Sequence, residues 1–144
     1  MKVLECSSKG DKRFSALYAL VEIKGVTESI ESWYQNSKRN LKGEVAGKGK
    51  PVAYMINPFN GNRLNVNCLT DFYNTLWIRY FIAHPELLKY AKTFDTFTDM
   101  FRGKCVNCQA DVIASCVKDF EAFKDTVRQS EFYKDCLKKK NNNK

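Results

Sequence analysis

The stretch that most constrains the fold reads Ser29-Ile30-Glu31-Ser32-Trp33-Tyr34-Gln35-Asn36-Ser37-Lys38. Its apolar side chains recur at the i, i+3 and i+4 spacing of a helix face that is turned into a core. Glu31, Gln35 and Lys38 form the neighbouring stripe, which lies about 100° round the helix from the apolar stripe. A carboxylate, an amide and an amine at the edge of a buried face indicate the lip of an active-site pocket. A solvated face with an i, i+4 pair is the alternative interpretation.

Strand signals lie on both sides of this helix. Residues 14–23 are predicted as a strand that is apolar on both faces and ends at Gly25, after which Thr27 or Ser29 caps the helix. Residues 52–56 and 63–66 are predicted as a β-hairpin, because Asn60-Gly61 between them is a strong tight-turn signal. The chain therefore combines short strands with helices.

Three further helical segments follow the hairpin. Thr70 is predicted to cap a helix that runs to Ala83, and Pro85 suits the first position of the next helix. A short segment begins at residues 95–96. A long helix is then predicted to start near Asn107 and to run to Leu137, with a break near Ser130.

Length and composition predict one globular domain. The 144 residues are 44 % hydrophobic and 13 % aromatic, and no apolar run approaches the ~18 residues of a membrane span. We expect the domain to cover residues 1–137 and the lysine- and asparagine-rich tail, 138–144, to be disordered. The N-terminal residues lack the apolar stretch of a signal peptide, so a cytoplasmic location without membrane attachment is expected.

The formal charge of +8 favours an anionic partner. Residues 42–51 form a basic, glycine-containing segment without the Gly-Lys-Ser/Thr ending of a phosphate-binding loop. A flexible connector is one interpretation of this segment, and contact with phosphate or DNA is another. Solubility alone is the alternative explanation of the overall charge.

The six cysteines do not predict a metal site. Cys105 and Cys108 have the spacing of a zinc ribbon, but the chain has no second close pair and only one histidine. Reduced, packed thiols are therefore expected, with a structural metal or a redox pair as the alternatives. We predict neither a metal nor a cofactor.

A second candidate binding segment spans residues 101–113. Arg102 and Lys104 bracket Gly103, and a helix start near Asn107 would add free backbone N–H groups, which together suit a pyrophosphate. Asp111 is a candidate second acid. The alternative is that Asp111 only favours the positive end of the helix dipole.

The order of these motifs resembles the NADAR family. Members carry a Ser-Val-Glu-His-x-Tyr-Gln-Ala-x-Lys type helix, matched by residues 29–38, after a Leu-Ser-Asn-Phe-Tyr type strand, matched by Phe14-Ser15-Ala16-Leu17-Tyr18. Trp77 and Arg79, and then Ala83-His84-Pro85-Glu86-Leu87, keep the family order. The resemblance covers roughly residues 12 to 117.

The resemblance implies an α+β fold of mostly helices round a small sheet, with the hairpin as an insertion. It also implies an N-glycosidase, and the basic charge favours removal of ADP-ribose from modified DNA bases, which would reverse a toxin's ADP-ribosylation. Glu31 would then stabilise the sugar cation, Lys38 would orient the substrate or attack it, and Asp111 would be a further acid. The substrate-binding residues would be Ser15, Tyr18, Trp33, Gln35, Arg102, Lys104 and Asn107.

Two departures from the family pattern keep a second function open. Ser32 stands where the family has His, and Ala16 stands where it usually has Asn. Either change is compatible with a protein that binds and sequesters an ADP-ribose-derived nucleotide without cleaving it. A DNA-binding module without a nucleotide pocket is a third class, but no aromatic and basic surface can be located for it.

Overall fold

The structure is a computed structural model that describes residues 1–101 and 107–138. Its elements, in chain order, are β1 (Val3–Glu5), the 3-10 turn η1 (Lys12–Phe14), β2 (Leu20–Ile23), β3 (Val26–Ser29), α1 (Ile30–Ser37), β4 (Lys38–Arg39), β5 (Tyr54–Ile56), β6 (Arg63–Leu64), η2 (Val66–Cys68), α2 (Leu69–Ala83), α3 (Pro85–Ala91), β7 (Thr96–Thr98), α4 (Gln109–Lys118), α5 (Phe120–Arg128) and α6 (Glu131–Cys136).

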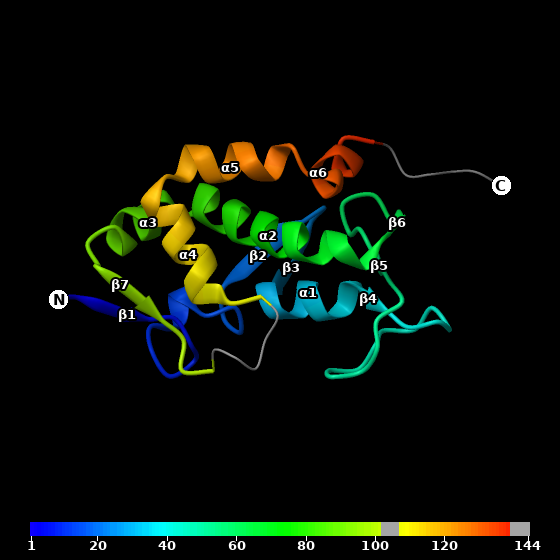
Figure 1. Cartoon of the computed structure of the whole chain (residues 1–144), viewed down its shortest axis with the longest axis horizontal. Helices are drawn as coiled ribbons and strands as arrows, with labels where there is room; N and C mark the ends of the chain where they lie inside the picture. The colour runs from blue at the N-terminus through cyan, green and yellow to red at the C-terminus, as the bar shows by residue number, and fades with distance from the viewer. Residues whose placement is uncertain (102–106, 139–144) are drawn as a thin grey trace.

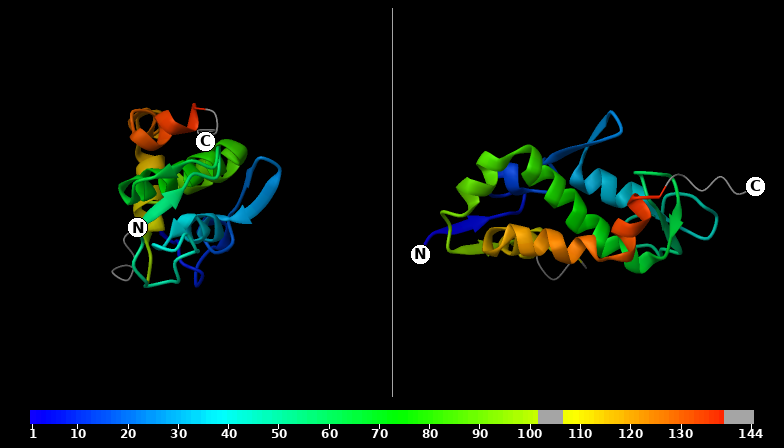
Figure 2. Two further views of the ribbon diagram at one scale, coloured as in Figure 1. Left: turned by 90° about the vertical axis from the view of Figure 1, so that its right-hand side faces the viewer. Right: turned by 90° about the horizontal axis from the view of Figure 1, so that it is seen from above.

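Helix α2 is the central element of the fold. Figures 1 and 2 show α5 and α6 along one side of α2, with α1 and the β2–β3 hairpin on the other. Trp77, Phe72, Phe81 and Leu76 of α2 are almost completely buried, because this helix is apolar over most of its circumference. One face of α2 therefore packs against α1, and another packs against the C-terminal helices.

The strands form small separate sheets. β1 pairs with β7 in parallel, β2 with β3 antiparallel, and β4, β5 and β6 form an antiparallel sheet in that order. The predicted α+β class is confirmed. The hairpin around Asn60-Gly61 is also confirmed, and Gly61 has the positive φ of 80° that such a turn requires.

The prediction of a strand over residues 14–23 is wrong in its first half. Ser15 closes η1, and the backbone turns through residues 15–19 before β2 begins at Leu20. Backbone hydrogen bonds from Tyr18 and Ala19 to the Ser15 carbonyl hold this turn. These local hydrogen bonds determine the backbone conformation here, although the apolar pattern had predicted an extended strand.

Two helix boundaries also differ from prediction. The helix α2 begins at Leu69, after Cys68, so Thr70 is its second residue and does not cap it. The long C-terminal helix is interrupted at Asp119 as well as near Ser130, because each of these residues caps a new helix through its side chain. Pro85 does begin α3, as predicted, and of the two predicted caps of α1, Thr27 and Ser29, it is Ser29 that caps the helix.

A buried carboxylate joins the hairpin loop to α6. Asp135 accepts hydrogen bonds from the side-chain amides of Asn57 (2.9 Å), Asn60 (3.0 Å) and Asn62 (3.2 Å). Burial by itself would raise the pKa of the Asp135 carboxyl, but these amides outweigh it, and the pKa lies below its ordinary value. This contact ties α6 to a segment more than seventy residues earlier in the chain.

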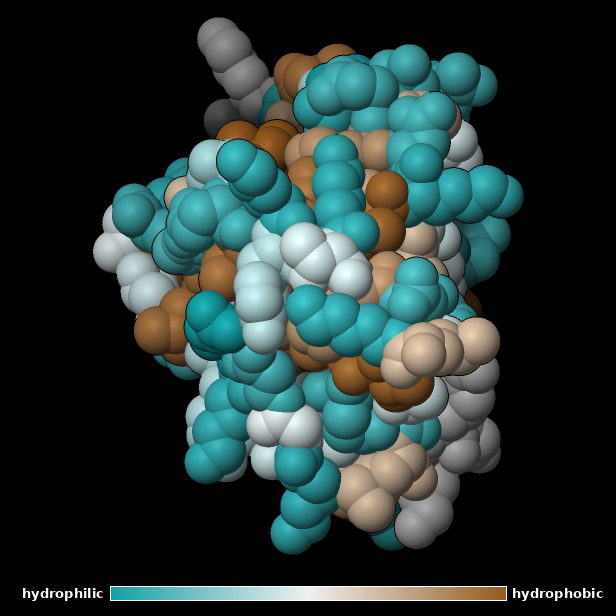
Figure 3. All heavy atoms as spheres, turned by 90° about the vertical axis from the view of Figure 1, so that its left-hand side faces the viewer, coloured by the Kyte–Doolittle hydropathy of each residue, from teal (hydrophilic) through white to brown (hydrophobic). Residues whose placement is uncertain are grey.

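The surface shows scattered hydrophobic residues. On the face in Figure 3, hydrophobic groups are small and separated by hydrophilic side chains. Over the two described ranges, every helix is too short or too polar to cross a lipid bilayer.

Candidate active site

The turn that precedes β2 positions the start of α1. The Ser29 hydroxyl accepts a hydrogen bond from Ser32 N at 3.0 Å and caps the helix, and Glu31 N donates to the Ala16 carbonyl at 2.9 Å. Glu31 is thereby held in the first helical turn, where a carboxylate favours the positive end of the helix dipole. Glu31 is half-buried.

Glu31 and Gln35 are in direct contact. Gln35 Nε2 donates to Glu31 Oε2 at 3.0 Å, as their i, i+4 spacing predicts. The other polar atom of this amide, Gln35 Oε1, is buried and has no hydrogen-bond partner among the described residues. An acceptor of that kind is available to a ligand hydroxyl.

Two aromatic residues of α2 line the same region. The rings of Tyr34 and Tyr73 meet edge to face, with centroids 5.1 Å apart. Burial raises the pKa of the Tyr73 hydroxyl, and negative charge on Glu31 adds to this rise. Trp77, one turn further along α2, is fully buried, and its side-chain hydrogen bond with Tyr73 partly offsets the rise in the pKa of that hydroxyl.

Asn107 reaches this region from the start of α4. Its Nδ2 donates to the Tyr34 hydroxyl at 2.6 Å, and Lys38 Nζ lies 4.4 Å from the centre of the Tyr34 ring. Tyr34 therefore lies between two residues predicted to bind substrate or take part in catalysis. We call Glu31, Tyr34, Gln35, Tyr73, Trp77 and Asn107 the α1–α2 cluster.

Gln109 fixes the position of α4 relative to α1. Its side-chain oxygen accepts from Ala16 N at 2.7 Å, and its Nε2 donates to Asp99 at 2.9 Å. Ala16 thus bonds to α1 through its carbonyl and to α4 through its N–H. Tyr34, Tyr73 and Trp77 were not predicted as site residues, because aromatic residues at helical spacing are the usual pattern of a core. Gln109 was not predicted either, because its partners Ala16 and Asp99 lie 93 and 10 residues away in the sequence.

Other predicted site residues lie outside the α1–α2 cluster. Ser15 is buried, and its hydroxyl accepts from Leu17 N, while Tyr18 is half-exposed beside Lys12. Trp33 donates its indole N–H to the Val21 carbonyl at 2.8 Å, so its ring packs toward the β2–β3 hairpin. Asp111 is exposed in the first turn of α4.

Arg102, Lys104 and Cys105 lie outside the described residues. Within residues 1–101 and 107–138, no group of three or more histidine, cysteine, aspartate or glutamate side chains could hold a metal ion. Hollows of about 240 and 580 Å³ are lined by residues of α2, α5 and α6, and by residues 40–53, respectively, and Glu31 lines neither. The second hollow belongs to the basic segment that was interpreted as a connector or a phosphate contact.

The α1–α2 cluster combines one ionisable carboxylate with several hydrogen-bonding groups in a partly dry region. Tyr73 keeps its proton at neutral pH, as an ordinary tyrosine does, and its raised pKa strengthens this, so its hydroxyl is a donor or an acceptor but not a base. Glu31 is therefore the anionic group that can stabilise a positive charge or activate water in this cluster. Gln35 Oε1 can add one acceptor.

Comparison with known families gives a match over the C-terminal part of the chain. Residues 42–144, more than half of the chain, match the family described as DarT1-associated NADAR antitoxin. These residues contain α2, Asn107 and α4, whereas α1 and Glu31 precede them. No curated protein matches the chain.

Proposed function

We propose, because the chain belongs to the DarT1-associated NADAR antitoxin family, that it is an N-glycosidase that removes ADP-ribose from modified DNA bases. The observation that carries the proposal is the pairing of Glu31 with Gln35 beside the buried hydroxyl of Tyr73. Family membership supports the antitoxin role, and the formal charge of +8 supports a nucleic-acid substrate.

The proposed reaction breaks the bond between the ribosyl C1 and the base nitrogen. Positive charge builds on the sugar as this bond lengthens, and the Glu31 carboxylate stabilises that charge and accepts a proton from the attacking water. The water oxygen bonds to C1, and the bonding electrons leave with the base, which takes up a proton. Gln35 orients ribose hydroxyls and Lys38 orients the substrate, which lowers the entropic cost of reaching this geometry.

Mass spectrometry of ADP-ribosylated DNA after incubation with the protein tests the proposal. We expect free ADP-ribose and the restored base. Unchanged modified DNA, under conditions in which the protein remains folded, would contradict hydrolysis.

A sequestering function is the second candidate. Ser32 and Ala16 occupy positions where the resemblance places histidine and asparagine, and both lie next to the proposed site. A protein of this kind would release an intact ADP-ribose-derived nucleotide after heat denaturation. The same mass spectrometry measurement distinguishes this outcome from free ADP-ribose.

Arg102 and Lys104 are predicted to bind the diphosphate of the ligand. Replacing both with alanine should weaken diphosphate ligands by about 1.5–3 kcal/mol for each charged hydrogen bond lost, while simple ribosides keep their affinity. Calorimetric titration measures the difference. The double replacement of the exposed Lys89 and Lys92 with alanine is the matched control, because it removes the same charge from α3. Equal losses for ligands with and without phosphate would contradict the prediction.

The basic tail is predicted to recruit polymeric DNA. Deletion of residues 139–144 should raise KM for modified DNA and flatten the salt dependence of KM. Lys138 is kept in this variant because its backbone N–H bonds to the Asp135 carbonyl. The value of kcat should hardly change, and a modified dinucleotide should show neither effect. Steady-state kinetics at two salt concentrations check this. Unchanged kinetics on DNA would exclude the recruiting role.

A further inference from the structure

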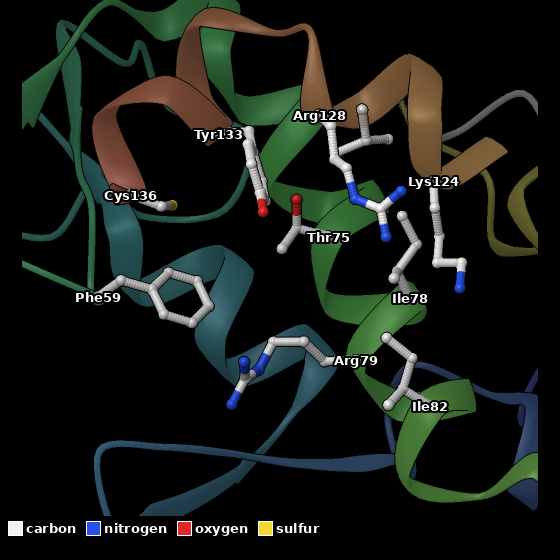
Figure 4. A pocket seen from close by; sticks show the side chains of 10 residues that line it. Phe59, Thr75, Ile78, Arg79, Ile82, Lys124, Arg128, Tyr133 and Cys136 are labelled. Carbon is white, nitrogen blue, oxygen red and sulfur yellow. The ribbon is translucent and has the colours of Figure 1, made fainter. Parts of the chain in front are cut away.

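A hollow lies between α2, α5 and α6. The hollow there has a volume of about 240 Å³, and its apolar floor includes Ile78, Ile82 and Val127. Figure 4 shows Arg79, Lys124 and Arg128 around it, with Phe59 and Tyr133 at the end nearest α6. We call this site the α2–α5 groove. Its described lining contains three cationic residues and no acidic one.

The α2–α5 groove is separate from the α1–α2 cluster. Thr75, Arg79 and Ile82 follow the i, i+4, i+7 spacing of one helix face, and Tyr73 and Trp77 lie on the opposite face at 100° per residue. A ligand in the groove therefore does not contact the proposed hydrolytic site. The inference below does not rest on the proposed function.

One cation at the rim can exchange its present partner. Arg128 pairs with Asp125 at 2.7 Å, and both side chains are exposed, at 46 % and 66 %. Exposed ion pairs of this kind contribute little free energy, so a carboxylate brought in by a partner can replace Asp125 at small cost. Lys124 is only 15 % exposed and pairs at 2.8 Å with Glu121, whose side chain is 76 % exposed. Arg79 donates to the Glu22 carbonyl at 2.9 Å, and an approaching carboxylate would bind its other N–H groups.

The floor is aliphatic, which identifies the kind of group that fills it. Ile82 is 58 % exposed on α2, an exposure that an inserted apolar side chain would remove. Pockets for small-molecule ligands usually measure about 300–1,000 Å³, so this smaller hollow suits a single side chain that a larger partner presents.

We propose that the α2–α5 groove binds an acidic segment of a partner protein, with one large apolar side chain in the hollow and flanking carboxylates on Arg79, Lys124 and Arg128. Single-stranded nucleic acid fits less well. Bases need open aromatic faces for stacking, whereas Arg79 covers Phe59 at 5.1 Å and Phe59 also packs on Phe132. The charge of the rim and the apolar floor together match an acidic, apolar-anchored peptide.

Fluorescence anisotropy with a set of synthetic peptides tests this inference. Each peptide carries glutamates around one central leucine, isoleucine, phenylalanine or tryptophan. One control set has serine at the centre, and another has glutamine in place of glutamate. At least one acidic, apolar-centred peptide should bind about tenfold more tightly than both of its controls, because each control removes one of the two interactions. Failure of every peptide to exceed its controls would overturn the proposal.

Ile82→Glu locates the binding site. This variant places in the apolar floor a negative charge that repels the glutamates of the peptide, and it should weaken the best peptide about tenfold, whereas Val3→Glu, a similarly exposed change on β1, should not. Circular dichroism melting checks that both variants fold, and release of ADP-ribose should be unchanged in Ile82→Glu. Equal effects of the two variants on peptide binding would overturn the proposal. It would also be overturned if oligothymidine bound more tightly than the best peptide and lost this affinity in Ile82→Glu.

Discussion

Replacing Glu31 with glutamine is expected to reduce kcat for release of ADP-ribose from DNA by about 10²–10⁴-fold, the range typical of a lost general acid or base. The change removes the negative charge that would stabilise the sugar cation but keeps the side chain's length and shape. The helix should persist, since Glu31 N still bonds to the Ala16 carbonyl through the backbone. Affinity for the modified substrate should survive, so the loss should appear in kcat and not in KM.

Glu28→Gln is the matched control for this experiment. Glu28 lies on β3 three residues before Glu31, is exposed, and loses the same charge in the same substitution. Its kcat should remain at the wild-type level. A wild-type rate in Glu31→Gln would remove Glu31 from the chemistry and would make Asp111 the acid to test next.

Replacing Asp135 with asparagine is expected to lower the free energy of unfolding by about 2–4 kcal/mol at neutral pH. The side chain keeps its size, but one of its oxygens becomes an NH₂ group that faces the amide donors of Asn57, Asn60 and Asn62. Asn57 and Asn60 are themselves buried, so a donor left without an acceptor there keeps its full desolvation cost. Urea unfolding at pH 7 measures the effect.

The same contact predicts a pH dependence. The pKa of Asp135 lies below the ordinary value of 3.8 in the folded protein, because the amide donors stabilise the charged carboxylate more than burial destabilises it. Its contribution is therefore fully present above that ordinary value and is lost as the pH falls through the lower folded pKa. The difference between wild type and Asp135→Asn should accordingly shrink in urea unfolding below pH 3.8.

Asp125→Asn provides the control. Asp125 is exposed and forms an i, i+3 pair with Arg128, so its loss should change stability by less than about 0.5 kcal/mol. If both variants had equally small effects, the asparagine contacts of Asp135 would contribute no net stability.

The features predicted correctly from sequence are those with local causes. The i, i+4 contact of Glu31 with Gln35, the cap at Ser29 and the start of α3 at Pro85 each depend on residues within one helical turn. The hairpin around Asn60-Gly61 is local in the same sense. Where local signals competed, as in residues 14–19, hydrophobic alternation was the weaker guide, because turn and 3-10 hydrogen bonds satisfied the backbone instead.

The surroundings of Glu31 could not be predicted in the same way. The ring of Tyr73, from α2, meets that of Tyr34, Asn107 bonds to Tyr34 across 73 residues of sequence, and Gln109 bonds to Ala16 across 93. In the sequence, Tyr73 and Trp77 have the spacing of ordinary core residues, and only the packing of α1 on α2 brings Tyr73 against a residue of the motif helix. Trp33 shows the converse, since its place in the motif predicted a ligand contact and its indole N–H instead bonds to Val21.

The sequence alone determined most of the elements, the family resemblance and the choice of Glu31 as the candidate catalytic carboxylate, because helical period, turn residues and capping act over a few neighbouring positions. Tertiary structure decided which aromatic and amide groups surround Glu31, how Asp135 joins α6 to the hairpin loop, and where the α2–α5 groove lies. These depend on the contacts that α2 makes on its two faces, and contacts between residues far apart in the chain leave no periodic signal in the sequence.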